Sequence, residues 1–113
     1  MNETRRTPRY PFSAPSEIIV ESSLAKILCR VRELSLYGCY LDTCVPLGLQ
    51  SRALLKIYGP HEYFEANATV IYTHPLQGMG MVFREIKPAF VNILQKWLLE
   101  SMRKHSEQTN ENR

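Results

Sequence analysis

The sequence predicts an all-β fold, a six-stranded antiparallel β-barrel followed by a C-terminal α-helix. Three observations predict it. Apolar and polar residues alternate with a period of two over much of residues 16–84, which is typical of half-buried strands. Short links that contain glycine or proline separate these stretches, as in a closed or nearly closed barrel. After Pro88 the apolar spacing changes to three and four residues, which indicates an amphipathic helix.

The first two strands follow a proline-rich entry. Prolines between residues 8 and 15 keep the backbone extended, so the first strand is expected at residues 16–21. In the second strand every other residue from 25 to 31 is apolar, and the residues between them are mostly basic. Leu28 is the one apolar residue on the outer face. This stretch is therefore a half-buried strand.

Turn residues separate the remaining four strands. A turn-rich link at residues 33–38 leads to strands at residues 39–43, 52–58, 64–72 and 79–84. Alternation along the longest of these strands predicts inward side chains at Phe64, Ala66, Ala68, Val70 and Tyr72, and outward ones at Glu65, Asn67 and Thr69.

The helix is expected over residues 87–103, because Pro88 suits a first helical turn. Its apolar stripe contains Phe90, Val91, Leu94, Trp97 and Leu98. We expect this stripe to pack over one open end of the barrel, and the alternative is a dimer surface.

The chain is expected to form a single domain over residues 1–103, since 113 residues are too few for two independent cores. Within it we expect a flexible basic arm at 1–12, the barrel at 13–86 and then the helix. Residues 104–113 are nearly free of apolar side chains and are predicted to be a disordered tail.

Composition excludes several classes of protein. The longest apolar runs are far shorter than the roughly 20 residues that span a bilayer, so no membrane insertion is expected. The three cysteines (Cys29, Cys39 and Cys44) form no C-x-x-C pair, which favours reduced thiols in the cytoplasm over disulfides or zinc.

No catalytic constellation is visible. His61 and His74 fall in predicted turns and His105 in the polar tail, none of them at metal-ligand spacing from cysteine or carboxylate. There is no phosphate-binding glycine loop and no paired carboxylates. We therefore expect no enzyme activity, no metal and no cofactor.

Two segments carry the functional signal. Arg5, Arg6 and Arg9 cluster just before the first strand and give the pattern R-x-x-x-R, although such a cluster is often only a solvated tail. Residues 33–38, with the sequence E-L-S-L-Y-G, lie between the second and third strands. They match the pattern D/N-x-S-x-x-G except at the first position, where Glu33 stands in place of Asp or Asn.

These motifs, in this order and within this strand plan, resemble the PilZ domain, a bacterial receptor for the second messenger cyclic-di-GMP. Residues 78–83, with the sequence G-M-G-M-V-F, also resemble the last strand of that family. The resemblance covers about residues 5–100, and it implies a PilZ-type barrel whose ligand is cyclic-di-GMP.

The resemblance also implies site residues. Arg5 and Arg9 are implied to contact guanine and phosphate, with Arg6 beside them, because arginine grips guanine O6 and N7 or a phosphate in a bidentate manner. Glu33 and Ser35 are implied to make polar contacts to the ligand. Gly38 would provide a positive-φ turn or a close backbone approach. The alternative for Ser35 and Gly38 is a plain turn between strands.

Glu33 departs from the Asp or Asn of the pattern and is one methylene longer than Asp. A misplaced acceptor that leaves a buried donor unpaired costs about 1–3 kcal/mol, or roughly tenfold to a hundredfold in affinity. Weaker binding is therefore one prospect. In the empty state the glutamate can instead pair with Arg32 or with an arginine of the arm.

The resulting hypothesis is a disorder-to-order switch in which the ligand folds the basic arm onto the barrel and creates a surface for an unidentified downstream protein. The family suggests motility, exopolysaccharide production or biofilm formation as the process. The alternative is a degenerate PilZ adaptor that binds proteins and no nucleotide. We expect no DNA or RNA binding, since Glu62, Glu65 and Glu85 interrupt the outward positive charges. A dimer is possible.

Overall fold

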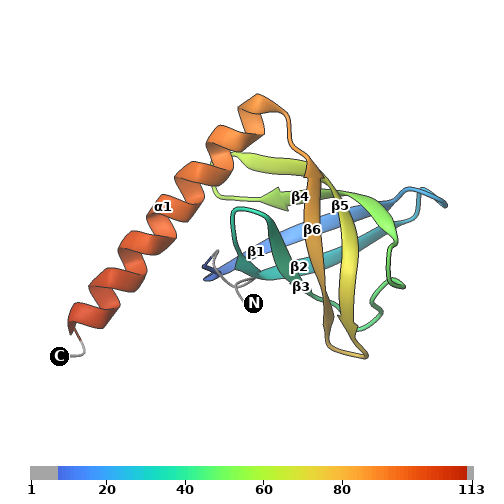
Figure 1. The fold of residues 1–113 in the computed structure, drawn as a ribbon, viewed down its shortest axis with the longest axis horizontal. Coiled ribbons are helices and arrows are strands. Elements are labelled where there is room, and N and C mark those ends of the chain that lie inside the picture. Colours follow the sequence, from blue (N-terminus) through green and yellow to red (C-terminus); the bar gives the residue numbers. More distant parts are fainter. Residues whose placement is uncertain (1–7, 112–113) are drawn as a thin grey trace, which may run out of the picture.

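The computed structural model describes residues 8–111 and contains one closed antiparallel barrel and one helix (Figure 1). In chain order the elements are β1 (Tyr10–Val20), β2 (Lys26–Leu34), β3 (Gly38–Asp42), β4 (Arg52–Tyr58), β5 (Tyr63–His74), β6 (Gly78–Glu85) and α1 (Pro88–Glu111). Around the barrel the strands follow the order β1-β2-β3-β6-β5-β4, and β4 pairs with β1 to close it. The predicted six-stranded barrel with a C-terminal helix is confirmed.

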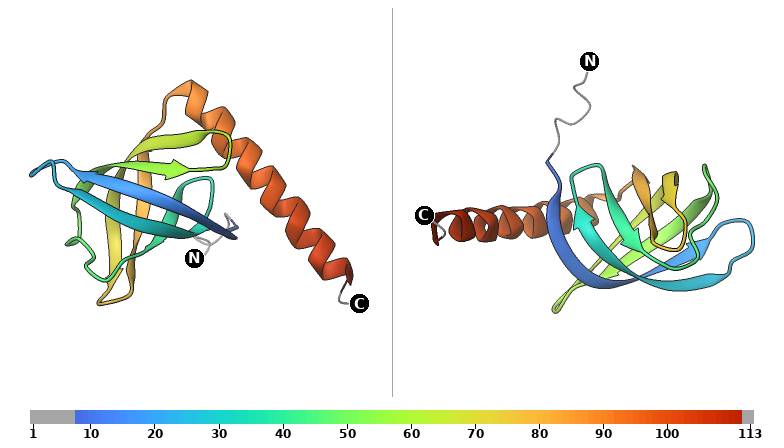
Figure 2. Two further views of the ribbon diagram at one scale, coloured as in Figure 1. Left: turned by 180° about the vertical axis from the view of Figure 1, so that it is seen from behind. Right: turned by 90° about the horizontal axis from the view of Figure 1, so that it is seen from below.

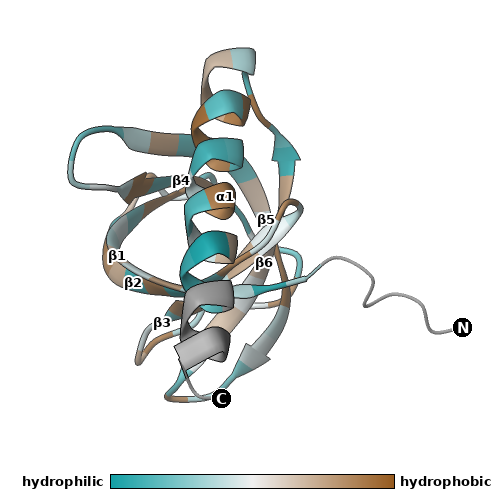
Figure 3. Cartoon of the chain, turned by 90° about the vertical axis from the view of Figure 1, so that its left-hand side faces the viewer, coloured by the Kyte–Doolittle hydropathy of each residue, from teal (hydrophilic) through white to brown (hydrophobic). Residues whose placement is uncertain are grey.

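The barrel interior is filled by the apolar residues that the alternation of the sequence predicts. Ile18, Leu55, Phe64 and Met79 are fully buried, and they come from four different strands. Because each strand turns every second side chain inward, the polar residues between them form the outer face. Viewed from the side of α1, apolar and polar positions alternate along the strands and the helix (Figure 3).

Strand β1 begins earlier than predicted, at Tyr10 instead of residue 16. Residues 10–12, which the sequence assigned to the flexible arm, therefore belong to the barrel. Pro11 and Pro15 are tolerated because only residues from Ser16 onward pair with β4, so the first half of the strand has a neighbour on one side alone. A register shift between Pro11 and Ala14 also bends the strand there.

Helix α1 packs its apolar stripe on the barrel, as expected. Leu94, Trp97 and Leu98 are buried, and the Trp97 ring stacks on Phe12 of β1 with 5.1 Å between ring centroids. The helix is longer than predicted and ends at Glu111, so most of the predicted disordered tail is helical. The physical reason is that residues 104–111 contain no proline or glycine to stop it. Its C-terminal turns project past the barrel (Figure 2).

No helix in residues 8–111 is long and apolar enough to span a membrane.

The three free cysteines differ in exposure, which predicts their reactivity. Burial raises the pKa of the Cys39 thiol strongly and that of the half-buried Cys29 thiol, whereas Cys44 is exposed. Because the thiolate is the nucleophile, iodoacetamide should modify Cys44 first and Cys39 only after unfolding. Mass spectrometry of the partly modified native protein checks this order. Modification of Cys39 as fast as Cys44 would contradict the burial, and Cys44→Ser provides the control.

Candidate ligand-binding site

The turn between β2 and β3 is built around the side chain of Ser35. The Ser35 hydroxyl accepts hydrogen bonds from the N–H groups of Tyr37 (3.2 Å) and Gly38 (3.1 Å), and it donates to the Gly38 carbonyl (3.2 Å). The Ser35 N–H also donates to that carbonyl, at 2.9 Å. A hydroxyl has one hydrogen to donate and two lone pairs, so these contacts use its full capacity. Ser35 therefore fixes the shape of a two-residue hairpin loop.

Gly38 is required by the close approach of β3 to β6. A Cβ added at Gly38 would overlap the Met81 carbonyl oxygen and lie 3.2 Å from the Val82 Cα. Its φ is not positive, so of the two roles expected for this glycine the structure shows the close backbone approach. The N–H of Phe83 donates to the Tyr37 carbonyl at 2.8 Å and ties the loop to β6.

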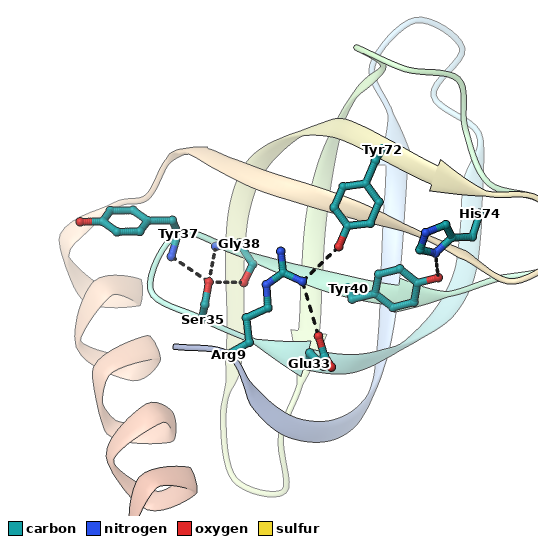
Figure 4. A network of polar contacts seen from close by, with 8 residues as sticks. All are labelled: Arg9, Glu33, Ser35, Tyr37, Gly38, Tyr40, Tyr72 and His74. Carbon is teal, nitrogen blue, oxygen red and sulfur yellow. Dashed lines mark hydrogen bonds and ion pairs between the residues drawn. The ribbon is translucent and has the colours of Figure 1, made fainter. Parts of the chain in front are cut away.

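Arg9, the residue before β1, lies over this region (Figure 4). Its Nη1 is 3.7 Å from Glu33 Oε1 and donates to the Tyr72 hydroxyl at 3.2 Å. The two charged side chains remain 53% and 42% exposed. Of the two partners expected for the Glu33 carboxylate, the structure pairs it with the arm arginine, since Arg32 pairs instead with Asp42 at 3.2 Å.

An aromatic cluster extends the site along the outer face. The Tyr40 and Tyr72 rings stack with centroids 6.1 Å apart, and each lies within 5.6 Å of the His74 ring. The Tyr40 hydroxyl is 2.9 Å from His74 Nδ1. Partial burial, followed by the negative charge of Asp42, raises the pKa of the Tyr40 phenol above its ordinary value. The cluster presents flat apolar faces next to the Arg9 guanidinium.

Two glycines of β6 make room for these rings. A Cβ at Gly80 would overlap the Tyr72 ring, and one at Gly78 would lie 2.7 Å from the Tyr40 hydroxyl. Tyr72 reaches this position because β5 contains an extra residue, Ile71, between the pairs formed by Val70 and Tyr72. This bulge turns Tyr72 to the outer face, so its predicted inward orientation is wrong.

The pocket beneath Arg9 is small, about 220 Å³, and its lining includes Glu33, Ser35, Gly38, Tyr72 and Gly80. Pockets that enclose a small-molecule ligand usually measure about 300–1,000 Å³. The arrangement combines a guanidinium donor, a carboxylate acceptor and aromatic faces. Such groups suit the binding of a flat, polar anion.

Comparison with known proteins identifies the family. The sequence model of the PilZ domain matches residues 3–100, which is most of the chain. The chain belongs to the PilZ domain family. No curated protein sequence matches it.

Several solved structures share the fold. The PilZ domain of YcgR from Escherichia coli, determined with cyclic-di-GMP, superposes with a TM-score of 0.75 at 18% identity, over 96% of this chain and 98% of that one. The PilZ domain of CeSA from a cellulose-synthesizing bacterium gives 0.67 at 14% identity, over 82% and 96%. The Bacillus subtilis inhibitor of motility, MotI/DgrA, gives 0.71 at 17% identity, over 95% of this chain and 53% of that one.

The structure brings together four of the six predicted site residues of this PilZ domain. Arg9, Glu33, Ser35 and Gly38 line one pocket. Arg5 and Arg6 lie outside the described residues.

Sequence reasoning missed Tyr40, Tyr72 and His74, and it placed His74 in a solvated turn. The spacing of Gly78 and Gly80 could have indicated these rings. Two glycines two residues apart leave one face of β6 without side chains, and neighbouring rings can pack there.

Proposed function

We propose that this PilZ domain is a receptor for cyclic-di-GMP and that the ligand binds between the N-terminal arginines and the outer face of β2, β3, β5 and β6. The observation that carries the proposal is the position of Arg9, which lies over the Ser35–Gly38 turn between Glu33 and Tyr72. The YcgR structures similar to this chain were determined with the same ligand. The domain acts by binding and catalyses no reaction.

The side chains suit the chemistry of the ligand. Cyclic-di-GMP offers two phosphates and two guanines, and an arginine fork can bind a phosphate or the O6 and N7 atoms of guanine. The Glu33 carboxylate can accept from the guanine N1–H and amino group. The Tyr72 ring provides a stacking face. The Ser35 hydroxyl already makes its full number of hydrogen bonds within the turn, so it contributes by holding Gly38 and the turn amides in place. A direct contact with the ligand requires that one of these hydrogen bonds be exchanged.

Binding requires the pocket to open. A dinucleotide exceeds 220 Å³, so Arg9 has to leave Glu33 and close again over the ligand. This costs little, because a half-exposed ion pair contributes at most about 1 kcal/mol. In the proposed mechanism the ligand phosphates then attract Arg5, Arg6 and Arg9, and the arm becomes ordered on the barrel and forms a new surface for a partner protein.

Calorimetric titration with cyclic-di-GMP tests this proposal. We expect saturable binding to the wild type and weaker binding to Arg5→Ala, with cyclic-di-AMP as the control for guanine recognition. Equal affinity of wild type, Arg5→Ala and Arg9→Ala would exclude a role for the arm. The absence of binding to the wild type would favour the adaptor function.

Replacement of Glu33 by Asp should tighten binding. The Glu33→Asp variant restores the shorter acceptor of the family pattern. Aspartate loses less rotamer entropy on binding, and because it is shorter it reaches Arg9 less well when no ligand is bound. We expect affinity for cyclic-di-GMP to rise about tenfold, which corresponds to about 1.4 kcal/mol. Calorimetry measures the change, and Glu33→Gln is the control for charge. Weaker binding of Glu33→Asp would show that the longer carboxylate is adapted to this ligand.

One observation favours the alternative, a PilZ adaptor that binds proteins and no nucleotide. Both Glu33 and the Ser35 hydroxyl have partners within the domain. This arrangement also serves as a stable structural contact.

The cellular setting is part of the proposal. The ligand is a bacterial second messenger, and the free thiols of Cys29, Cys39 and Cys44 agree with a reducing cytoplasm. Motility or biofilm formation is the expected process. The similarity to MotI/DgrA, which is named as an inhibitor of motility, is compatible with the first of these.

A further inference from the structure

A second cavity lies on the outer face of the barrel, away from the Arg9 pocket. It measures about 750 Å³, which is within the usual range for ligand sites. We call it the Arg52–Arg84 groove, and its defining side chains are Ile19, Leu24, Arg52, Leu54, Thr69 and Arg84. No residue that lines the Arg9 pocket also lines this groove.

Two guanidinium groups face this groove without a carboxylate partner. Neither Arg52 nor Arg84 forms an ion pair within 4.0 Å with any residue that the structure describes. Within residues 8–111 the Arg84 side chain makes one hydrogen bond, from Nε to the Thr69 hydroxyl at 3.2 Å, and this bond does not use the terminal nitrogens of the fork. Two guanidinium groups that line one groove and have no carboxylate partner among the described residues indicate a site for an anionic group.

The backbone is shaped to present Arg84 here. In the β5–β6 pairing Asn67 lies opposite Glu85 and Ala68 opposite Phe83, so Arg84 is the extra residue of a bulge. Bulges of this kind redirect a side chain. Thr69 is only 3% exposed, and its hydroxyl fixes the direction of the Arg84 side chain.

The lining favours a peptide over a nucleotide. Ile19, Leu24 and Leu54 give it an aliphatic floor, and none of the described lining residues is aromatic, so a base finds no ring to stack on. Glu21 and Glu85 at the same groove balance the two arginines, so the groove suits a single carboxylate better than a multiply charged polyphosphate. A peptide that carries one carboxylate and an aliphatic side chain satisfies the arginines and covers the floor.

We propose that the Arg52–Arg84 groove is a docking site for an extended segment of a partner protein in which an acidic residue lies next to an aliphatic one. The proposal goes beyond the nucleotide-binding function and requires no nucleotide. Strand β6 nevertheless connects the two sites, because Arg84 follows Phe83, whose N–H donates to the Tyr37 carbonyl in the motif turn.

Selection from a random displayed peptide library on the wild-type protein, without nucleotide, tests the proposal. We expect enrichment of Asp or Glu beside Leu, Ile or Val. By fluorescence anisotropy, Arg52→Gln and Arg84→Gln should each weaken binding of an enriched peptide about tenfold, as loss of a charge-assisted hydrogen bond predicts. Arg103→Gln, an exposed arginine on α1, is the matched control and should leave binding unchanged.

A second measurement uses the unaltered protein. Exchange of the acidic residue of the peptide for its amide should weaken binding to the wild type by a similar factor. The proposal is overturned if no peptide is enriched, if enriched peptides lack acidic residues, or if the Gln variants bind them as well as the wild type. Competitive displacement by cyclic-di-GMP or by single-stranded RNA would also overturn it. The outcomes of the peptide selection and of the Gln variants do not bear on whether the Arg9 pocket binds nucleotide.

Discussion

The Arg9→Ala variant should lose most of its affinity for cyclic-di-GMP, by at least about thirtyfold. Removal of one partner from a desolvated charged hydrogen bond costs about 2–5 kcal/mol, and the lower figure corresponds to this factor. The mutation also removes the Arg9–Glu33 ion pair of the ligand-free protein. Because this pair is half-exposed and contributes little free energy, its removal compensates for little of the lost affinity. Isothermal titration calorimetry of wild type and variant measures the difference.

Two further variants separate charge from geometry at this position. Arg9→Lys keeps the charge but not the bidentate fork, so we expect intermediate affinity. Arg103→Ala removes one positive charge from the exposed surface of α1 and should bind like the wild type. An affinity of Arg9→Ala within twofold of that of Arg103→Ala would mean that Arg9 does not contact the ligand.

Trp97→Ala should lower the free energy of unfolding more than any other single substitution in α1. Trp97 is 4% exposed, stacks on Phe12, lies 6.3 Å from the Phe64 ring and donates from Nε1 to Glu62 Oε2 at 3.3 Å. Replacement of a buried tryptophan by alanine costs about 3–5 kcal/mol. Total stabilities of about 5–15 kcal/mol are usual, so the variant should be partly unfolded at moderate temperature.

Urea unfolding followed by far-UV circular dichroism measures this loss, because Trp97 is the only tryptophan and fluorescence is lost with it. Leu99→Ala is the matched control on the same helix, since Leu99 is 62% exposed and its truncation should cost less than about 0.5 kcal/mol. A loss below about 1 kcal/mol in Trp97→Ala would show that α1 is not part of the barrel core.

Most of the fold could be predicted from the sequence because its two periodicities are clear. Alternation identified the strands, and the change of spacing after Pro88 identified the helix. The length of α1 could not be predicted from the apolar stripe, since helix continues through polar residues until something stops it. The early start of β1 could not be predicted because its first half contains prolines, which normally argue against a strand. They are tolerated here because this half pairs with only one neighbouring strand.

The candidate site was predicted less completely than the fold. The two motifs locate Arg9, Glu33, Ser35 and Gly38, which the structure brings to one pocket. The place of Tyr72 depends on a bulge at Ile71, and the run Val70-Ile71-Tyr72 is apolar throughout, so its hydropathy pattern does not reveal the inserted residue. Strand register is a tertiary property, and a one-residue shift reverses the face of every later side chain.

Amide chemical-shift mapping of the isotope-labelled wild-type protein during titration with cyclic-di-GMP tests the central claim most directly. We predict that the largest changes occur at Glu33, Ser35, Gly38 and Tyr72, and that they saturate together. Changes confined to the Arg52–Arg84 groove, around Thr69 and Arg84, or no changes at all, would contradict the proposed site.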